Sequence, residues 1–152
     1  MDCRVINTDV DFLSIIVLPT VDEFSRKPGD IRLGVLACLV LQAMNEHYFR
    51  HNLFDPNRSD NENDTELAKF KGALRAQDWV FGQIMDIANG TKHALTRFFD
   101  LHHQQPGVTG TLRAGFPMSS ANYVFIDEDN AWLLYQLTEH VAEAWKVRLG
   151  VV

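Results

Sequence analysis

Apolar residues recur at helical spacing over most of the chain, and this pattern predicts a mostly α-helical domain. The longest periodic segment runs from Ile31 to Leu53. Its predicted core stripe consists of Leu33, Leu36, Val40, Ala43 and Met44. Further apolar residues make its first half hydrophobic on nearly all sides, which is typical of a central, buried helix. Asp30 precedes this segment and is a suitable N-cap.

A first helix is predicted before it, over 11–25. Pro19 lies inside that segment and lacks a backbone N–H, so we expect it to kink the helix or to mark its true start. The polar stretch 55–64 is rich in turn-forming residues and predicts a surface loop, with Asp64 or Thr65 capping the helix that follows.

Two more helices are predicted after this loop. The first covers 65–76, and the second runs from an N-cap at Asp78 to about His93. Asn89 and Gly90 interrupt the second pattern, so we expect the helix to end or to weaken there.

The pattern changes after Leu101. Residues 108–116 are rich in Thr and Gly, and 122–126 form a strand-like run before a polar turn, which together predict a β-hairpin or an irregular excursion. A last helix is predicted over 132–149. We therefore expect one domain over 1–152: a bundle of about five helices with a small β-hairpin before the C-terminal helix.

Composition supports a single globular domain. The chain has 152 residues, of which 46% are hydrophobic and 22% charged, close to the averages for folded proteins. Its two cysteines, Cys3 and Cys38, do not suggest a disulfide framework or a metal site. The N-terminus lacks a signal-peptide pattern, and the longest apolar run, 35–41, is far short of the ~20 residues that span a bilayer. We expect a cytoplasmic protein with no membrane partner.

The net charge of −6 is unevenly distributed. Five acidic residues and no Lys or Arg lie between Asp127 and Glu143, whereas 67–126 has six Lys and Arg against three Asp. Overall acidity disfavours binding to duplex DNA, which requires many cations on one surface. A local site for phosphate or a short RNA remains compatible with the basic middle of the chain.

One polar stripe in that basic region could bind an anion. Asp86, Asn89, His93 and Arg97 are spaced by three, four and four residues, so a continuous helix places them on one face. Lys92, His93 and Arg97 would then hold a phosphate, while Asp86 or Asn89 orients the imidazole. The alternative is an ordinary solvent-facing side of an amphipathic helix.

Arg97 and His102 also form an Arg followed at the fifth position by a His. This spacing resembles the Arg-x4-6-His motif of HEPN-domain proteins, which are helical bundles, often dimeric, and many of which cleave RNA. The resemblance implies that Arg97 contacts phosphate and that His102 acts as general acid and base, with His93 nearby. Phe98 departs from the family pattern, which usually has a polar residue after the Arg. The run Ala88–His93, with the hairpin and last helix, is similar to uncharacterised bacterial proteins, a resemblance that implies no activity.

A metal-binding bundle is a third hypothesis. His47 and His51 are four residues apart on one predicted helix, and His140 with Glu143 could complete a site. Histidines at the border of a core, with their nitrogens bonded to backbone or water, are the ordinary explanation of the pair. The Glu-x-x-His repeats of di-iron bundles are absent, so we expect no metal or other cofactor.

No phosphate-binding glycine loop, nucleophile elbow or His-Glu-x-x-His motif is present in the sequence. The leading hypothesis is therefore a helical interaction or regulatory module without catalysis of its own. We expect a homodimer, because Trp132, Trp145 and many Phe residues could leave an apolar helix face for self-association.

Overall fold

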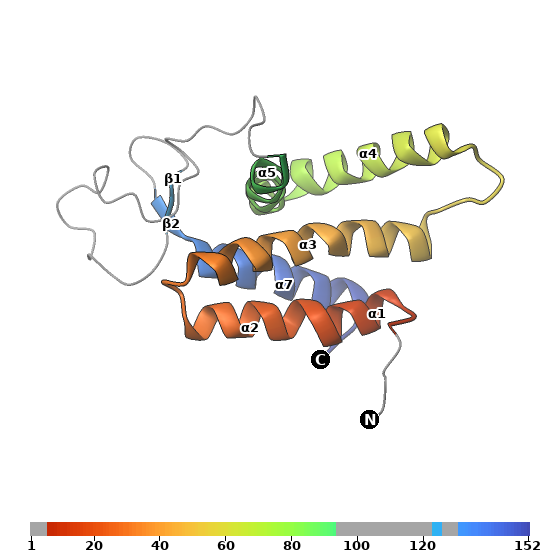
Figure 1. The fold of residues 1–152 in the computed structure, drawn as a ribbon. Helices are drawn as coiled ribbons and strands as arrows, with labels where there is room; N and C mark the ends of the chain where they lie inside the picture. The colour runs from red at the N-terminus through yellow and green to blue at the C-terminus, as the bar shows by residue number, and fades with distance from the viewer. Residues whose placement is uncertain (1–5, 94–122, 126–130) are drawn as a thin grey trace.

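A computed structural model describes residues 6–93, 123–125 and 131–152. These residues are mostly helical and confirm the predicted fold class: a helical bundle with a short antiparallel β-pair before the C-terminal helix. Helices α2 (Leu18–Arg26), α3 (Ile31–Asn52) and α7 (Leu134–Leu149) lie alongside one another (Figure 1). Helix α4 (Asp60–Gln77) extends beside α3, and α5 (Trp79–His93) crosses the bundle. No helix in the described ranges is long and apolar enough to cross a membrane.

The N-terminal helix begins earlier than predicted and continues through Pro19. Helix α1 (Asp9–Phe12) starts with a capping box, in which the Thr8 hydroxyl accepts from the Asp11 N–H and the Asp11 carboxylate accepts from the Thr8 N–H. A π-helical turn, Leu13–Val17, then joins α1 to α2. Pro19 is the second residue of α2, two positions after the end of this π turn. The wider π turn just before it lets the chain stay helical.

The cap of α3 is as predicted. The Asp30 carboxylate accepts hydrogen bonds from the Arg32 and Leu33 N–H groups, at 3.0 and 3.4 Å. The predicted core stripe of this helix is confirmed in part: Met44 is fully buried, and Leu33 and Val40 pack against the core, whereas Leu36 is 46% exposed. The buried residues of the helix are Gly34, Ala37, Cys38, Leu41, Met44, Asn45 and Phe49.

Helix α4 starts five residues before its predicted beginning. Ser59 is the N-cap, and a capping box links its hydroxyl and backbone to Glu62. The expected caps Asp64 and Thr65 are therefore inside the helix. Asn63 is buried (4% exposed), and its amide bonds the backbone N–H and carbonyl of Asp55, which ties the α3–α4 loop to α4.

The prediction for α5 holds at its start, where the Asp78 carboxylate accepts from the Val80 N–H at 3.0 Å. The expected break at Asn89 and Gly90 is absent, since the backbone stays helical to His93.

Strands β1 (Tyr123–Phe125) and β2 (Ala131–Leu133) pair antiparallel, with Val124 opposite Trp132. The last helix therefore begins at Leu134, two residues after the predicted Trp132. Strand β1 falls in the predicted strand-like run 122–126, whereas β2 includes Trp132, where the helix was expected to begin. The predicted turn at 127–130 and the run 108–116 lie outside the described residues.

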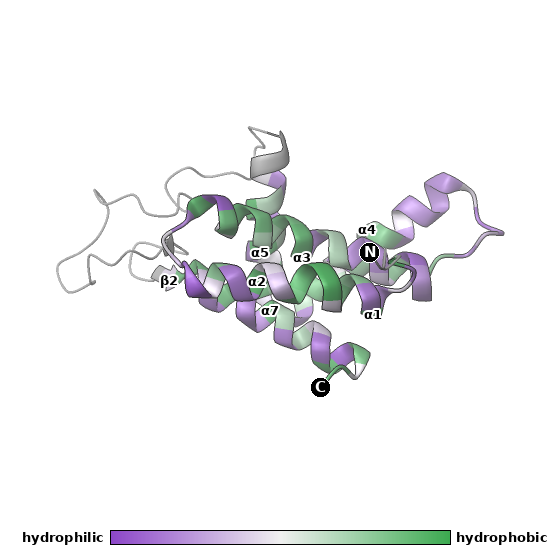
Figure 2. Cartoon of the chain, turned by 60° about the horizontal axis from the view of Figure 1, so that its bottom comes forward, coloured by the Kyte–Doolittle hydropathy of each residue, from purple (hydrophilic) through white to green (hydrophobic). Residues whose placement is uncertain are grey.

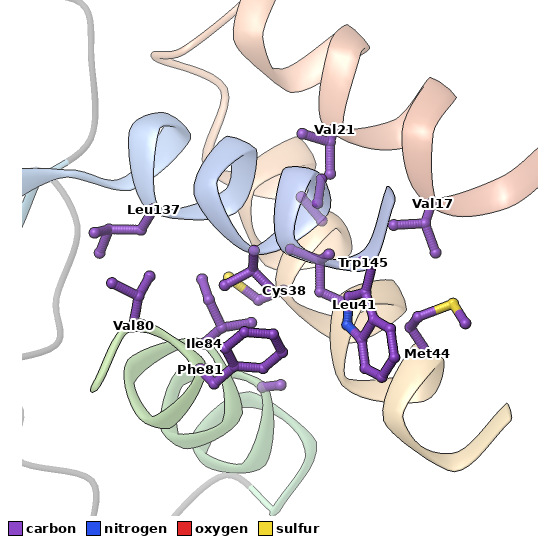
Figure 3. Close-up of a cluster of buried hydrophobic side chains, with 14 of the residues drawn as sticks. Val17, Val21, Cys38, Leu41, Met44, Val80, Phe81, Ile84, Leu137 and Trp145 are labelled. Atoms are coloured by element: carbon purple, nitrogen blue, oxygen red, sulfur yellow. The ribbon is translucent and has the colours of Figure 1, made fainter. Parts of the chain in front are cut away.

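The core lies where α2, α3, α5 and α7 meet (Figure 3). Trp145 of α7 is fully buried and packs against Phe81 of α5 and Tyr48 of α3, with ring centroids 6.0 and 5.1 Å apart. The indole of Trp145 is therefore a core element, which corrects its expected place on an association face. Cys38 is also fully buried in this core, and burial raises the pKa of its thiol to about 12.

Candidate interaction surfaces

Asp86, the first residue of the predicted anion-binding stripe, is engaged with another helix. Its carboxylate receives two hydrogen bonds from the Arg75 guanidinium of α4, at 2.8 and 3.0 Å. Gly82, one turn earlier on α5, leaves room for Arg75, because a Cβ there would lie 3.0 Å from the Arg75 Cγ. This bidentate pair joins α4 to α5, and it raises the pKa of Arg75.

Asn89 is likewise used between helices. Its side-chain oxygen accepts from the amide of Gln42 on α3, at 2.7 Å. Both Asp86 and Asn89 are half-buried, so the idea of a solvent-facing stripe fails at these two positions. Lys92 and His93 lie in the last turn of α5, but only their backbone is described.

Arg97 and His102 lie outside the described residues. The phosphate-binding and HEPN-like hypotheses therefore remain predictions.

Two of the histidines proposed as metal ligands, His47 and His140, contact other side chains. The His47 ring stacks on Phe12, with centroids 3.8 Å apart, and burial is the main cause of its lowered pKa, followed by the charges of His51 and Arg50. His140 Nε2 lies 2.6 Å from the Asp78 carboxylate. Within the part of the chain that is described, no three His, Cys, Asp or Glu side chains are grouped to hold a metal ion.

An apolar surface on the N-terminal half of α3 is the first feature that sequence reasoning missed. We call it the α3 strip: Ile31, Val35, Leu36 and Leu39, with Arg32 at its edge. Ile31 and Leu36 are 41% and 46% exposed, and Val35 and Leu39 are half-buried. Figure 2 shows the apolar character of this half of α3, in contrast to the mainly hydrophilic α4. The signal was in the sequence, but hydrophobicity all round the helix was interpreted as burial.

A second surface is an open groove of about 810 Å³ between α7 and the junction of α4 with α5. We call it the α7 groove. Leu74 and Phe81 form its buried floor, and Ala144 and Val147 of α7 contribute further apolar surface. Its polar lining consists of Gln77, Asp78, Gln136, Glu139, His140, Glu143 and Arg148.

Two exposed tryptophans pack on each other close to this groove. Trp79 and Trp132 are 44% and 45% exposed, and their ring centroids are 5.7 Å apart. Trp79 follows the groove residue Asp78, and Trp132 lies in β2, four residues before the groove residue Gln136 of α7. Exposed aromatic side chains of this kind are frequent anchors in protein–protein interfaces.

Comparisons with protein-family models, with curated proteins and with solved structures found no match to this chain.

Proposed function

We propose that the protein is a helical interaction module without catalysis of its own, and that it forms a homodimer through the α3 strip. The observation that carries this proposal is the exposure of Ile31 and Leu36 beside Val35 and Leu39 on one side of α3. Single exposed apolar residues are ordinary on protein surfaces, whereas a contiguous group is typical of an association site.

A second copy of the chain is the occupant that the composition of the strip favours. Arg32 is the single charged residue in its lining, and its guanidinium already lies 3.0 Å from the Asp30 carboxylate. The strip therefore presents almost no charge with which to select a different partner. Two identical helix faces can pack about a two-fold axis, with each strip covering the other.

The size of the strip sets the expected strength of the dimer. Ile31 to Leu39 span about 12 Å of helix at a rise of 1.5 Å per residue. A standard stable interface buries about 800 Å² on each partner, which is more than so short a segment offers. We therefore expect a dissociation constant on the order of 10 μM or weaker.

Sedimentation equilibrium with two matched variants tests this proposal. Leu36→Glu places a charge in the middle of the strip, whereas Phe54→Glu changes a residue of nearly equal exposure (44%) outside it. Fully burying a Leu or Ile side chain is worth about 1.5–3 kcal/mol, so burying the exposed half of Leu36 in both copies contributes roughly 2 kcal/mol. Leu36→Glu should weaken the dimer by more than about tenfold, and Phe54→Glu should leave it unchanged.

If Leu36→Glu and Phe54→Glu changed the dissociation constant equally, the dimer interface would not lie on the α3 strip. A wild-type protein that stays monomeric up to several hundred micromolar would overturn the proposal.

A further inference from the structure

The α7 groove combines an apolar floor with exposed apolar surface on its wall. Leu74 and Phe81 are 3% and 7% exposed at its base, while Val147 is 80% exposed. Val147 lies three residues after Ala144 on α7, so the side chains of these two residues face the same side of the helix. Figure 3 shows α5 and α7 packed together next to this region, with Val80 against Leu137. The hydrophobic contact between α5 and α7 is thus continuous with the α7 groove, which is open and partly apolar.

The walls of the groove are mainly acidic. Asp78, Glu139 and Glu143 supply three carboxylates, against one guanidinium from Arg148. Glu143 is paired with Lys146 at 2.9 Å, and Asp78 lies against His140. Among the described residues Glu139 has no ion-pair partner.

Arg148 does not neutralise these carboxylates at close range. Its guanidinium carbon lies 5.4 Å from the Trp145 ring, 5.5 Å from the Tyr48 ring and 6.0 Å from the Phe70 ring. Its described hydrogen bond goes to the Gln77 side chain, at 3.4 Å. The cation is thereby held against aromatic faces of α3, α4 and α7. Of the carboxylates that line the groove, Glu139 is therefore the one available to a positive charge from a binding partner.

We infer that the α7 groove binds a segment of a partner protein that carries both apolar residues and Lys or Arg. The apolar side chains of such a segment fit the floor and Val147, and its cations face Glu139. Its path follows α7 towards the Trp79–Trp132 pair, which lies close to the Gln136 end. This is the geometry of a helix or extended peptide laid in a groove. The inference rests on the proposed role as an interaction module, but it uses a surface different from the α3 strip.

Fluorescence anisotropy with a labelled 16-residue peptide of Leu and Lys, arranged as an amphipathic helix, tests the inference. The protein should be the full chain carrying Leu36→Glu, so that dimerisation does not contribute. A second peptide with each Lys replaced by Glu controls for charge. Glu139→Lys should weaken binding of the Lys peptide by about fivefold or more, since it reverses a charge at the contact.

Asp64→Lys is the matched control variant, because it makes the same change in net charge at an exposed position of α4 outside the groove. It should weaken binding by less than about twofold, because a distant exposed charge is screened at physiological salt. Val147→Ser should also weaken binding, which tests the apolar part of the contact.

If Glu139→Lys and Asp64→Lys weakened binding of the Lys peptide equally, the binding would reflect general attraction to an acidic protein, and the inference would be overturned. Equal binding of the Lys and Glu peptides, or no binding of the Lys peptide, would overturn it as well. These results leave the dimer proposal intact if sedimentation still detects a dimer sensitive to Leu36→Glu. If peptide binding depends on Glu139 and Val147 but the wild-type protein never dimerises, the inference about the α7 groove would be supported and the proposed homodimer would be refuted.

Discussion

Gly34 of α3 lies directly against Phe24 of α2 and Leu134 of α7, and Gly34→Ala should destabilise the protein. A Cβ at this position would lie 2.9 Å from the Phe24 ring and 3.0 Å from Leu134 Cδ2. Both neighbours are fully buried (0% exposed), so neither can swing into solvent. Overpacking of this kind typically costs about 1–3 kcal/mol. Replacing Gly by Ala inside a helix gains about 0.5–1 kcal/mol, so the net loss in the free energy of unfolding should be about 1 kcal/mol.

Gly72→Ala is the matched control. Gly72 is exposed in α4, and a Cβ there would meet no atom within 4 Å. This variant should be stabilised by about 0.5–1 kcal/mol, so the two substitutions should differ by about 2 kcal/mol. Urea unfolding followed by circular dichroism measures both, and a difference of this size corresponds to about 4–8 °C in Tm for a chain of this length. If Gly34→Ala were stabilised as much as Gly72→Ala, the described packing of α3 on α2 and α7 would be wrong.

Other expected outcomes concern single side chains. Asn63→Ala should lower the free energy of unfolding by about 1–3 kcal/mol, because it removes a buried amide from its backbone partners, whereas the exposed Asn61→Ala should change it little in urea titrations. In a Cys3→Ser variant the folded protein should not react with a thiol reagent at pH 8, since the pKa of Cys38 is about 12; rapid reaction would contradict its burial. The wild type should not cleave single-stranded RNA or transfer RNA. Cleavage that His102→Ala reduces by 10²-fold or more would favour the HEPN-like hypothesis over an interaction module.

Local signals in the sequence predicted much of the helical framework. Asp30 and Asp78 cap α3 and α5 as expected, because an N-cap depends on a side chain and the two or three N–H groups that follow it. The same kind of signal at Ser59 and Glu62 was readable as a capping box, but the polar composition around it was interpreted as loop. Pro19 was less predictable, since a π turn that accommodates a proline has no clear sequence pattern.

The surfaces were harder to predict, because they depend on which helix faces find a partner. In α3 the apolar residues occupy nearly every side, so periodicity could not distinguish the buried Ala37 from the exposed Leu36. Asp86 and Asn89 have the spacing of a solvent-facing stripe, yet each bonds a side chain from another helix, Arg75 and Gln42. Such partners are distant in sequence, and only the packing of the helices brings them together.

The contact between two α3 strips is the central claim, and a distance between two copies tests it most directly. A nitroxide label at Arg32→Cys, in the Cys3→Ser background, lies at the edge of the strip, where the side chain of Arg32 is 87% exposed. Pulsed electron paramagnetic resonance should then detect label pairs closer than about 35 Å, because packed helix axes lie about 8–10 Å apart and the whole strip is only about 12 Å long, to which the length of the two label side chains is added. The dipolar signal should rise with protein concentration and disappear in Leu36→Glu. A dimer in solution without label pairs in this range would contradict the proposed interface.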